Sequence, residues 1–203
     1  MNGWTVHKRW IQVVTGGLVL CLLLSLCRLY GQGEEVREQV VRLHILANSD
    51  SEADQQLKLQ VRDAVVEAAA GWLDGAANTA AALAMAEEAL PRLEAVAQQT
   101  VEAAGYAYPV EVELCRMYFT TRQYDTVTLP AGTYEAVRVT IGEGAGRNWW
   151  CVVYPPLCAG AATDRKTLAD VLDAGGQKLV EGGGFTVKFK VLEWLEGLLT
   201  LFR

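Results

Sequence analysis

The sequence predicts an α+β protein in which an N-terminal signal or anchor helix precedes one domain, with a mostly antiparallel or mixed sheet packed by two to three helices. Three observations lead to this fold class. An uncharged apolar run comes first, helical spacing of apolar residues follows, and alternation of apolar and polar residues marks the second half. We divide the chain into residues 1–33, a signal peptide or membrane anchor with a short linker, and residues 34–203, an exported domain.

The charge of the chain is unevenly distributed. Of its 203 residues, 18 are lysine or arginine and 24 are aspartate or glutamate, giving a formal net charge of -6. Residues 1–33 contain three of the basic residues and no acid, so the rest of the chain carries 15 basic and 24 acidic side chains. A nucleic-acid-binding surface needs lysine and arginine to neutralise phosphates. The acidic domain therefore argues against nucleic acid as a partner.

The N-terminal segment has the pattern of a secretory signal or a signal anchor. Residues 10–26 carry no charge and are mostly apolar, and Lys8 and Arg9 precede them. The run is short for a spanning helix, but residues 10–30 reach the roughly 20 residues that a bilayer requires. The small residues of the sequence 31–33 resemble a cleavage site, so cleavage and retention both remain open. The preceding cations favour a cytoplasmic N-terminus and an exported domain; a buried core helix of a soluble protein is the alternative.

The first part of the exported domain predicts one strand and one helix. Residues 31–35 form a short polar linker, and residues 41–46 alternate between apolar and polar side chains as a strand does. Cap-forming residues follow, and Ser51 with Asp54 has the form of a capping box. The next helix presents an apolar stripe at spacings of four and three residues. That stripe consists of Leu57, Val61, Val65, Ala68 and Trp72.

A second helical stretch begins at about residue 78 and is rich in alanine. Pro91 is expected to break or kink it, because proline is tolerated in the first turn of a helix but not in its interior. Residues 91–104 then form a further helix, which Gly105 closes. Two or three helices thus separate the first strand from the others.

The second half of the domain is expected to consist mainly of strands. Alternation predicts one strand from Val110 and another over residues 133–141. Residues 148–154 are apolar at both parities, which is typical of a strand in the middle of a sheet covered on both sides. The glycine-rich residues 142–146 have the pattern of a hairpin loop between these last two strands. The C-terminal pattern predicts a helix, a strand and an amphipathic segment, at residues 168–172, 185–189 and 191–201.

Three of the five cysteines lie in the exported part. Cys151 and Cys158 bracket the sequence CVVYPPLC, whose Tyr-Pro-Pro can reverse the chain, so the sequence favours a disulfide in an oxidising compartment. Two buried free thiols are the alternative. The spacing of these cysteines, with no histidine nearby, matches no zinc site, and neither a metal nor a cofactor is expected.

The exported part has a single histidine, His44, which limits the catalytic systems that it can build. A nucleophile activated by histidine would require His44 beside Cys151 or a serine. The position of His44 is that of an ordinary strand residue, and no acid pair stands out as a hydrolase dyad. We therefore predict that the protein is not an enzyme, with a secreted hydrolase using Cys151 or His44 as an alternative.

The chain contains several distinctive sequence motifs. They are VRLHILANSDS at residues 41–51, DQQLK at 54–58, VRDAV at 61–65, PAGTYEA at 130–136, GEG at 142–144 and NWWCVVYPPLC at 148–158. In this order, they resemble the signatures of the stage II sporulation protein R family. The resemblance covers roughly residues 36–160, and the last string is the most specific.

This resemblance implies a signalling protein of endospore-forming bacteria. Family members are exported from the forespore into the space between forespore and mother cell, and are secreted or anchored by the N-terminal segment. There they trigger a membrane-embedded aspartic protease of the mother cell, which processes pro-sigma-E. A generic exported binding or envelope-structural domain is the alternative. We expect the membrane to be contacted through residues 10–30. The residues hypothesised to contact the protease are Asn48, Ser49, Asp50, Arg62, Asp63, Arg147 and Asn148.

Overall fold

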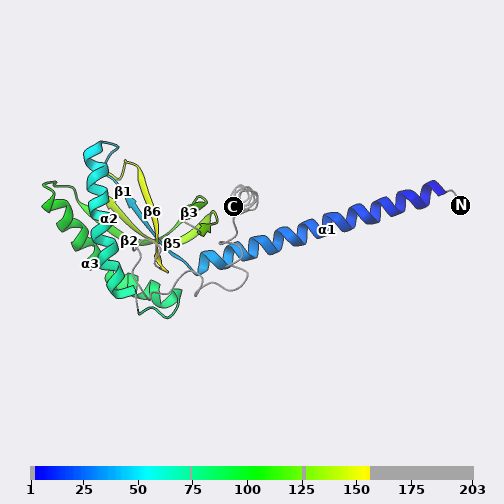
Figure 1. Ribbon diagram of the computed structural model, residues 1–203, viewed down its shortest axis with the longest axis horizontal. Helices are drawn as coiled ribbons and strands as arrows, with labels where there is room; N and C mark the ends of the chain where they lie inside the picture. Colours follow the sequence, from blue (N-terminus) through cyan, green and yellow to red (C-terminus); the bar gives the residue numbers. More distant parts are fainter. Residues whose placement is uncertain (1–2, 74, 125–126, 156–203) are drawn as a thin grey trace.

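The computed structural model describes residues 3–73, 75–124 and 127–155 of the chain (Figure 1). The elements are α1 (Gly3–Glu38), β1 (Val41–Leu46), α2 (Glu52–Leu73), α3 (Thr79–Ala103), β2 (Val110–Phe119), β3 (Arg122–Tyr124), β4 (Val127–Leu129), β5 (Gly132–Ile141) and β6 (Asn148–Tyr154). A long apolar helix precedes a mixed sheet packed by helices, which confirms the α+β fold class. The helix, strand and amphipathic segment predicted between residues 168 and 201 lie outside the described residues.

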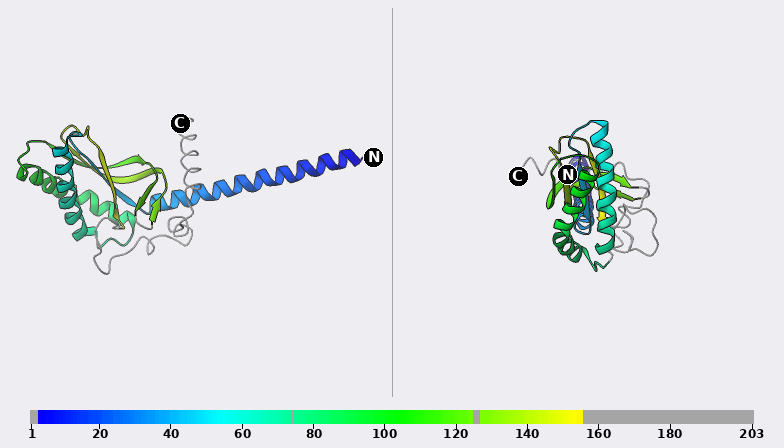
Figure 2. Two further views of the ribbon diagram at one scale, coloured as in Figure 1. Left: turned by 45° about the horizontal axis from the view of Figure 1, so that its top comes forward. Right: turned by 90° about the vertical axis from the view of Figure 1, so that its left-hand side faces the viewer.

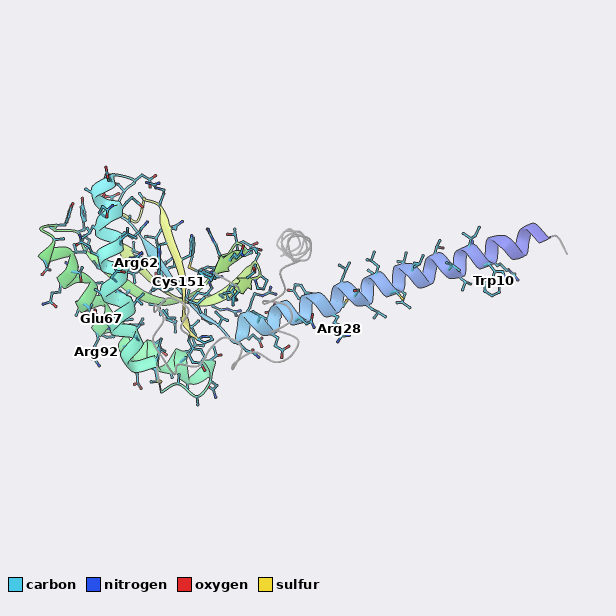
Figure 3. All side chains as sticks on the ribbon, viewed as in Figure 1. Trp10, Arg28, Arg62, Glu67, Arg92 and Cys151 are labelled. Carbon is cyan, nitrogen blue, oxygen red and sulfur yellow. The ribbon has the colours of Figure 1, made fainter. Side chains whose placement is uncertain are left out.

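Helix α1 extends from the domain as a long stalk (Figure 1). Among the described residues, the exposed large apolar side chains lie between Trp10 and Leu24, with Tyr118 as the exception. Trp10 and Arg28 lie toward the two ends of this uncovered stretch (Figure 3). The 36 residues of α1 span about 54 Å, well beyond the roughly 30 Å of a bilayer core. The helix is therefore long and apolar enough to cross a membrane.

The prediction of a polar linker at residues 31–35 is wrong, because these residues continue α1. The last turns of α1 belong to the domain. Val36, in the last turn, and Val40, two residues after the end of the helix, are both fully buried. Arg37 Nη1 donates a hydrogen bond to the Ala131 carbonyl oxygen at 3.0 Å. This packing outweighs the weak helix propensity of the two glycines in the segment. The domain boundary at residue 33 stays a prediction.

The two helices after β1 begin at polar caps. The Asp54 backbone N–H donates to Ser51 Oγ at 3.1 Å, which confirms the predicted cap. Asn78 caps α3 in the same way, with Oδ1 accepting from the Ala81 backbone N–H at 2.9 Å. A break at Pro91 does not occur, because α3 runs through it from Thr79 to Ala103. Pro91 is exposed, so water can solvate the carbonyl that loses its partner.

Within residues 3–155, apart from the gaps at 74 and 125–126, the main sheet has four strands in the order β2-β5-β1-β6. Strand β1 is parallel to β5 and antiparallel to β6, with Leu43 opposite both Val137 and Cys151. The predicted hairpin between β5 and β6 is therefore wrong: β1 lies between these strands, and residues 142–146 cross over its end. In the part of the chain described, β6 is at the edge of the sheet and not in its middle. Side chains on both sides of β6 are apolar because each face of the sheet is covered by an apolar cluster: Cys151 and Val153 belong to one cluster and Val152 to the other.

The two faces of the sheet are covered by different elements. Helices α2 and α3 cover one face (Figure 2), where Val41, Leu43 and Ile45 of β1 join the main core. Arg42 and His44 alternate with these residues and belong to the opposite face. The end of α1 and the β3–β4 hairpin contribute to a second apolar cluster with residues of β2, β5 and β6. This hairpin was not predicted.

The backbone of β2, at the other edge of the sheet, is hydrogen-bonded by side chains from α3. The Val110 backbone N–H donates to Gln98 Oε1 at 2.9 Å, and the Val112 backbone N–H donates to Glu94 Oε2 at 3.2 Å. Gln98 Nε2 also donates to the Tyr108 carbonyl oxygen at 3.3 Å. These bonds satisfy strand groups that would otherwise be open to another strand.

We predict that Gln98→Ala lowers the free energy of unfolding of the full chain in detergent by about 1 to 2 kcal/mol, because the Val110 N–H loses its acceptor. Chemical unfolding followed by circular dichroism measures the change. Gln99→Ala is the matched control, since Gln99 is exposed on the same helix. Equal stability of the two variants would contradict the role of Gln98.

Candidate functional site

The predicted contact residues gather where β1 ends, α2 begins and the β5–β6 loop crosses. We call this region the polar corner. It consists of Asn48, Ser49, Asp50, Asp54, Lys58, Arg62, Asp63 and residues 142–149. Asp54, Lys58 and Arg62 follow one another at intervals of four residues, so they lie along one side of α2. The polar corner therefore joins two loops to one helix face.

Backbone contacts hold the β5–β6 loop against the end of β1. The Gly146 N–H donates to the Ala47 carbonyl oxygen at 2.9 Å, and the Ala145 N–H donates to the Asn48 carbonyl oxygen at 3.2 Å. A Cβ atom at Gly146 would overlap the backbone carbonyl of Ser49. Gly142 has a φ of 58°, a left-handed conformation that favours glycine. The glycines of this loop thus permit its close approach to β1.

Asp54 is the centre of the hydrogen-bond network. Its Oδ2 atom accepts from Ser49 Oγ at 2.5 Å and from Asn48 Nδ2 at 2.9 Å. Asn48 Oδ1 in turn accepts from the Glu143 backbone N–H at 3.0 Å, which ties the β5–β6 loop to α2. The hydrogen bonds from Ser49 and Asn48 lower the pKa of the buried Asp54 carboxyl, because they stabilise its charged form.

Lys58 ties the other end of the loop to α2. Its Nζ donates to the Arg147 carbonyl oxygen at 2.9 Å and to Gln55 Oε1 at 2.6 Å. The Lys58 side chain is buried. The pKa of Lys58 is lowered, mainly because burial disfavours the charged ammonium group, and the positive charge of Arg147 acts in the same direction. Lys58 therefore serves as an internal hydrogen-bond donor of the polar corner.

The outer surface of the polar corner carries two charged pairs. Arg147 Nε lies 3.6 Å from Asp50 Oδ1, and both side chains are about two-thirds exposed. Arg62, labelled in Figure 3, lies on α2. It pairs with Asp63 at 2.6 Å, and its guanidinium carbon lies 5.4 Å from the centre of the Trp149 ring. Such exposed ion pairs add little stability, so their charges are available to a partner.

The structure separates the predicted contact residues into two groups. Asp50, Asp63, Arg147 and Asn148 are exposed, and Arg62 is partly exposed. Asn48 and Ser49 are half-buried and bind Asp54, so their role within the domain is structural. Sequence reasoning placed Asp54 only in a cap and missed Lys58. The spacing of four residues from Asp54 to Lys58 and Arg62 was the available signal.

His44 lies beside the polar corner, on the face of the sheet that is opposite to α2 and α3. Its ring stacks on Trp150 with centroids 3.9 Å apart, and its Nε2 lies 3.0 Å from Asn148 Oδ1. Burial lowers the pKa of His44, which favours the neutral ring. Cys151 is buried and disulfide-bonded, so its sulfur is not a free thiolate. The predicted partner, Cys158, lies outside the described residues, and the pairing stays a prediction.

We predict that Gly146→Ala lowers the free energy of unfolding by about 1 to 3 kcal/mol, because the added methyl group pushes the loop away from Ser49. Gly75→Ala is the control, since the nearest atom to its added Cβ is Met85 Cε at 3.9 Å. Denaturant titration of both full-length variants in detergent gives the comparison. A Gly146→Ala chain as stable as the parent would show that the loop contact is not tight.

We predict that Asp54→Asn lowers the free energy of unfolding at neutral pH by about 2 to 3 kcal/mol, because charged hydrogen bonds are lost. The pKa of Asp54 is lower in the folded chain than its ordinary value of 3.8. Its stabilising contribution is therefore present above pH 3.8 and is lost as the pH falls through the lower folded-state value.

The measurement for Asp54 compares parent and variant unfolding curves over a pH series from neutral to acid. The difference between the two chains is expected to shrink at the acid end, where the parent carboxyl becomes protonated. A difference that stays constant over the whole series would contradict a charged Asp54 at the centre of the network.

Comparison with known proteins identifies the family of the chain. The family model of stage II sporulation protein R matches residues 37–164, a range that includes the whole polar corner. Stage II sporulation protein R of Bacillus subtilis (strain 168) is 34% identical over 187 residues, covering 81% of this chain and 84% of that protein. No solved structure matches the chain. The chain therefore belongs to the stage II sporulation protein R family and has a role in sporulation.

Proposed function

We propose that this protein is an exported sporulation signal without catalytic activity of its own. Its N-terminal segment delivers the domain across the forespore membrane into the space between forespore and mother cell. There the domain activates a membrane-embedded aspartic protease of the mother cell, which then processes pro-sigma-E. Family membership and the uncovered apolar side chains of α1 support this proposal.

The position of the polar corner relative to α1 is the observation that carries the proposal. Strand β1 starts at Val41, three residues after α1 ends, and runs to Leu46, immediately before the polar corner. The six residues of β1 span about 20 Å. The polar corner therefore lies at the far end of β1 from the apolar helix (Figure 1). This direction suits a partner anchored in the opposite membrane.

The chemistry of the polar corner supports a protein partner. Asp50, Asp63, Arg62 and Arg147 offer charges of both signs on a surface that the internal network of Asp54 and Lys58 holds in place. Complementary charges at an interface favour specific and fast association. Trp149, half-buried beneath Arg62, adds an aromatic side chain of the kind enriched at binding surfaces.

We predict that this chain restores pro-sigma-E processing in a sporulating host that lacks its own stage II sporulation protein R. The double variant Arg62→Ala/Arg147→Ala should reduce processing at least about tenfold, as expected for the loss of two interface arginines. Immunoblotting of precursor and product measures the effect. The control is Arg92→Ala, an exposed arginine on α3 outside the polar corner (Figure 3).

The proposal and its assigned surface fail in different ways. If the exported parent chain does not restore processing, the signalling function is wrong, and a generic envelope domain is favoured. If the parent restores processing and the folded, exported double variant is equally active, the polar corner is not the contact surface. Fractionation and thermal unfolding of each variant verify export and folding.

A further inference from the structure

Arg42, in the middle of the sheet, has a buried guanidinium group whose donors are mostly unused. Its side chain is fully buried, and Nη2 donates to the Tyr124 hydroxyl oxygen at 2.5 Å. In the described part of the chain, Nε and Nη1 have no hydrogen-bond partner. Among the described residues, Arg42 forms no ion pair. The ranges that the structure describes thus enclose a permanent charge without supplying an anion to it.

The surroundings of Arg42 satisfy only part of what a buried cation requires. Its guanidinium carbon lies over the rings of Phe119 at 4.1 Å and Tyr134 at 4.9 Å, and 5.7 Å from the centre of the Tyr124 ring. Ring faces attract a cation, but they do not replace acceptors for its N–H groups. Burial lowers the pKa of Arg42, and the nearby charge of Arg122 acts in the same direction. The site therefore has an excess of positive charge.

The donors of the guanidinium select the shape of an acceptor. Because the N–H groups of arginine point outward in the plane of the guanidinium, an acceptor that bonds to them must approach in that plane. A carboxylate is planar and presents two oxygens that match the paired donors of arginine. We propose that Arg42 is the centre of a carboxylate-binding site, which accepts an acidic side chain or a chain-terminal carboxylate of a bound polypeptide.

Tyr124 is the residue that closes this site. It lies in β3, which is hydrogen-bonded only to β4 among the described strands and does not join the four-stranded sheet. A change in the side-chain conformation of Tyr124 would withdraw its hydroxyl from Nη2 without breaking a ladder of the main sheet. One oxygen of the incoming carboxylate would then take the place of the hydroxyl at Nη2, and the other would accept from one of the neighbouring donors, Nε or Nη1. This site is separate from the polar corner and does not depend on the proposed function.

The test observes the Arg42 Nε–H signal by NMR in the full-length chain, labelled on arginine and held in detergent micelles. The signal is assigned by its loss in Arg42→Lys. Three peptides are titrated: acetyl-Ala-Glu-Ala-amide, acetyl-Ala-Ala-Ala with a free C-terminus, and acetyl-Ala-Gln-Ala-amide. We expect a saturable shift with one or both of the first two peptides and none with the neutral third. Which acidic peptide binds tells a side-chain carboxylate from a chain terminus.

A second variant tests the closing role of Tyr124. Tyr124→Phe keeps the ring but removes the hydroxyl, and should bind the acidic peptide about fivefold more tightly, because one competing hydrogen bond is gone. Tyr106→Phe, on the helix side of the sheet, is the control and should bind as the parent does. The proposal is overturned if no acidic peptide shifts the signal, if the neutral peptide shifts it equally, or if Tyr124→Phe does not bind more tightly.

Discussion

The position of β1 between β5 and β6 is the constraint on which the rest of the domain depends. This strand pairs along both edges, and the β5–β6 loop closes its end through the Gly146 and Ala145 backbone N–H groups. Because β5 and β6 cannot pair directly, their loop has to cross the end of β1. The crossing brings the loop to the first turn of α2. The polar corner is thus a consequence of the strand order.

The sequence was sufficient to predict most elements but not their neighbours. Alternation identifies β1, β2 and β5, since it reports which side chains share a face. It contains no information on which strand lies beside which, so the parallel pairing of β1 with β5 was not foreseen. The short strands β3 and β4 are below the length at which alternation is informative. At Pro91, local propensity was overridden by the packing of Leu93 and Ala97.

The sequence predicted which segments form the candidate site, but not which of its residues are internal hydrogen-bond partners and which are exposed. The passages that contain Asn48 and Arg147 are distant in sequence, and the structure brings them together through Glu143 and Asp50. Asn48 and Ser49 are internal because they donate hydrogen bonds to Asp54. These bonds depend on the conformation of the turn before α2, which the sequence pattern does not specify. Arg42 has the alternate position of a solvent-facing strand residue. Its burial follows from cover that the sequence did not reveal, namely the β3–β4 hairpin and the end of α1.

Helix α1 continues through the predicted cleavage site at residues 31–33 into the domain, so the contacts of its last turns determine what cleavage would change. If the segment is retained, the domain is held by the packed last turns of the helix, and the polar corner points away from the membrane. If the chain is cut after Gly33, Val36 and Arg37 remain with the domain, and the contact of Arg37 with Ala131 is preserved. Cleavage removes Tyr30, which packs against the second apolar cluster, but leaves the buried Val36 and Arg37 in place. Cleavage therefore changes how far the domain can travel, while the polar corner at the other end of β1 is unchanged.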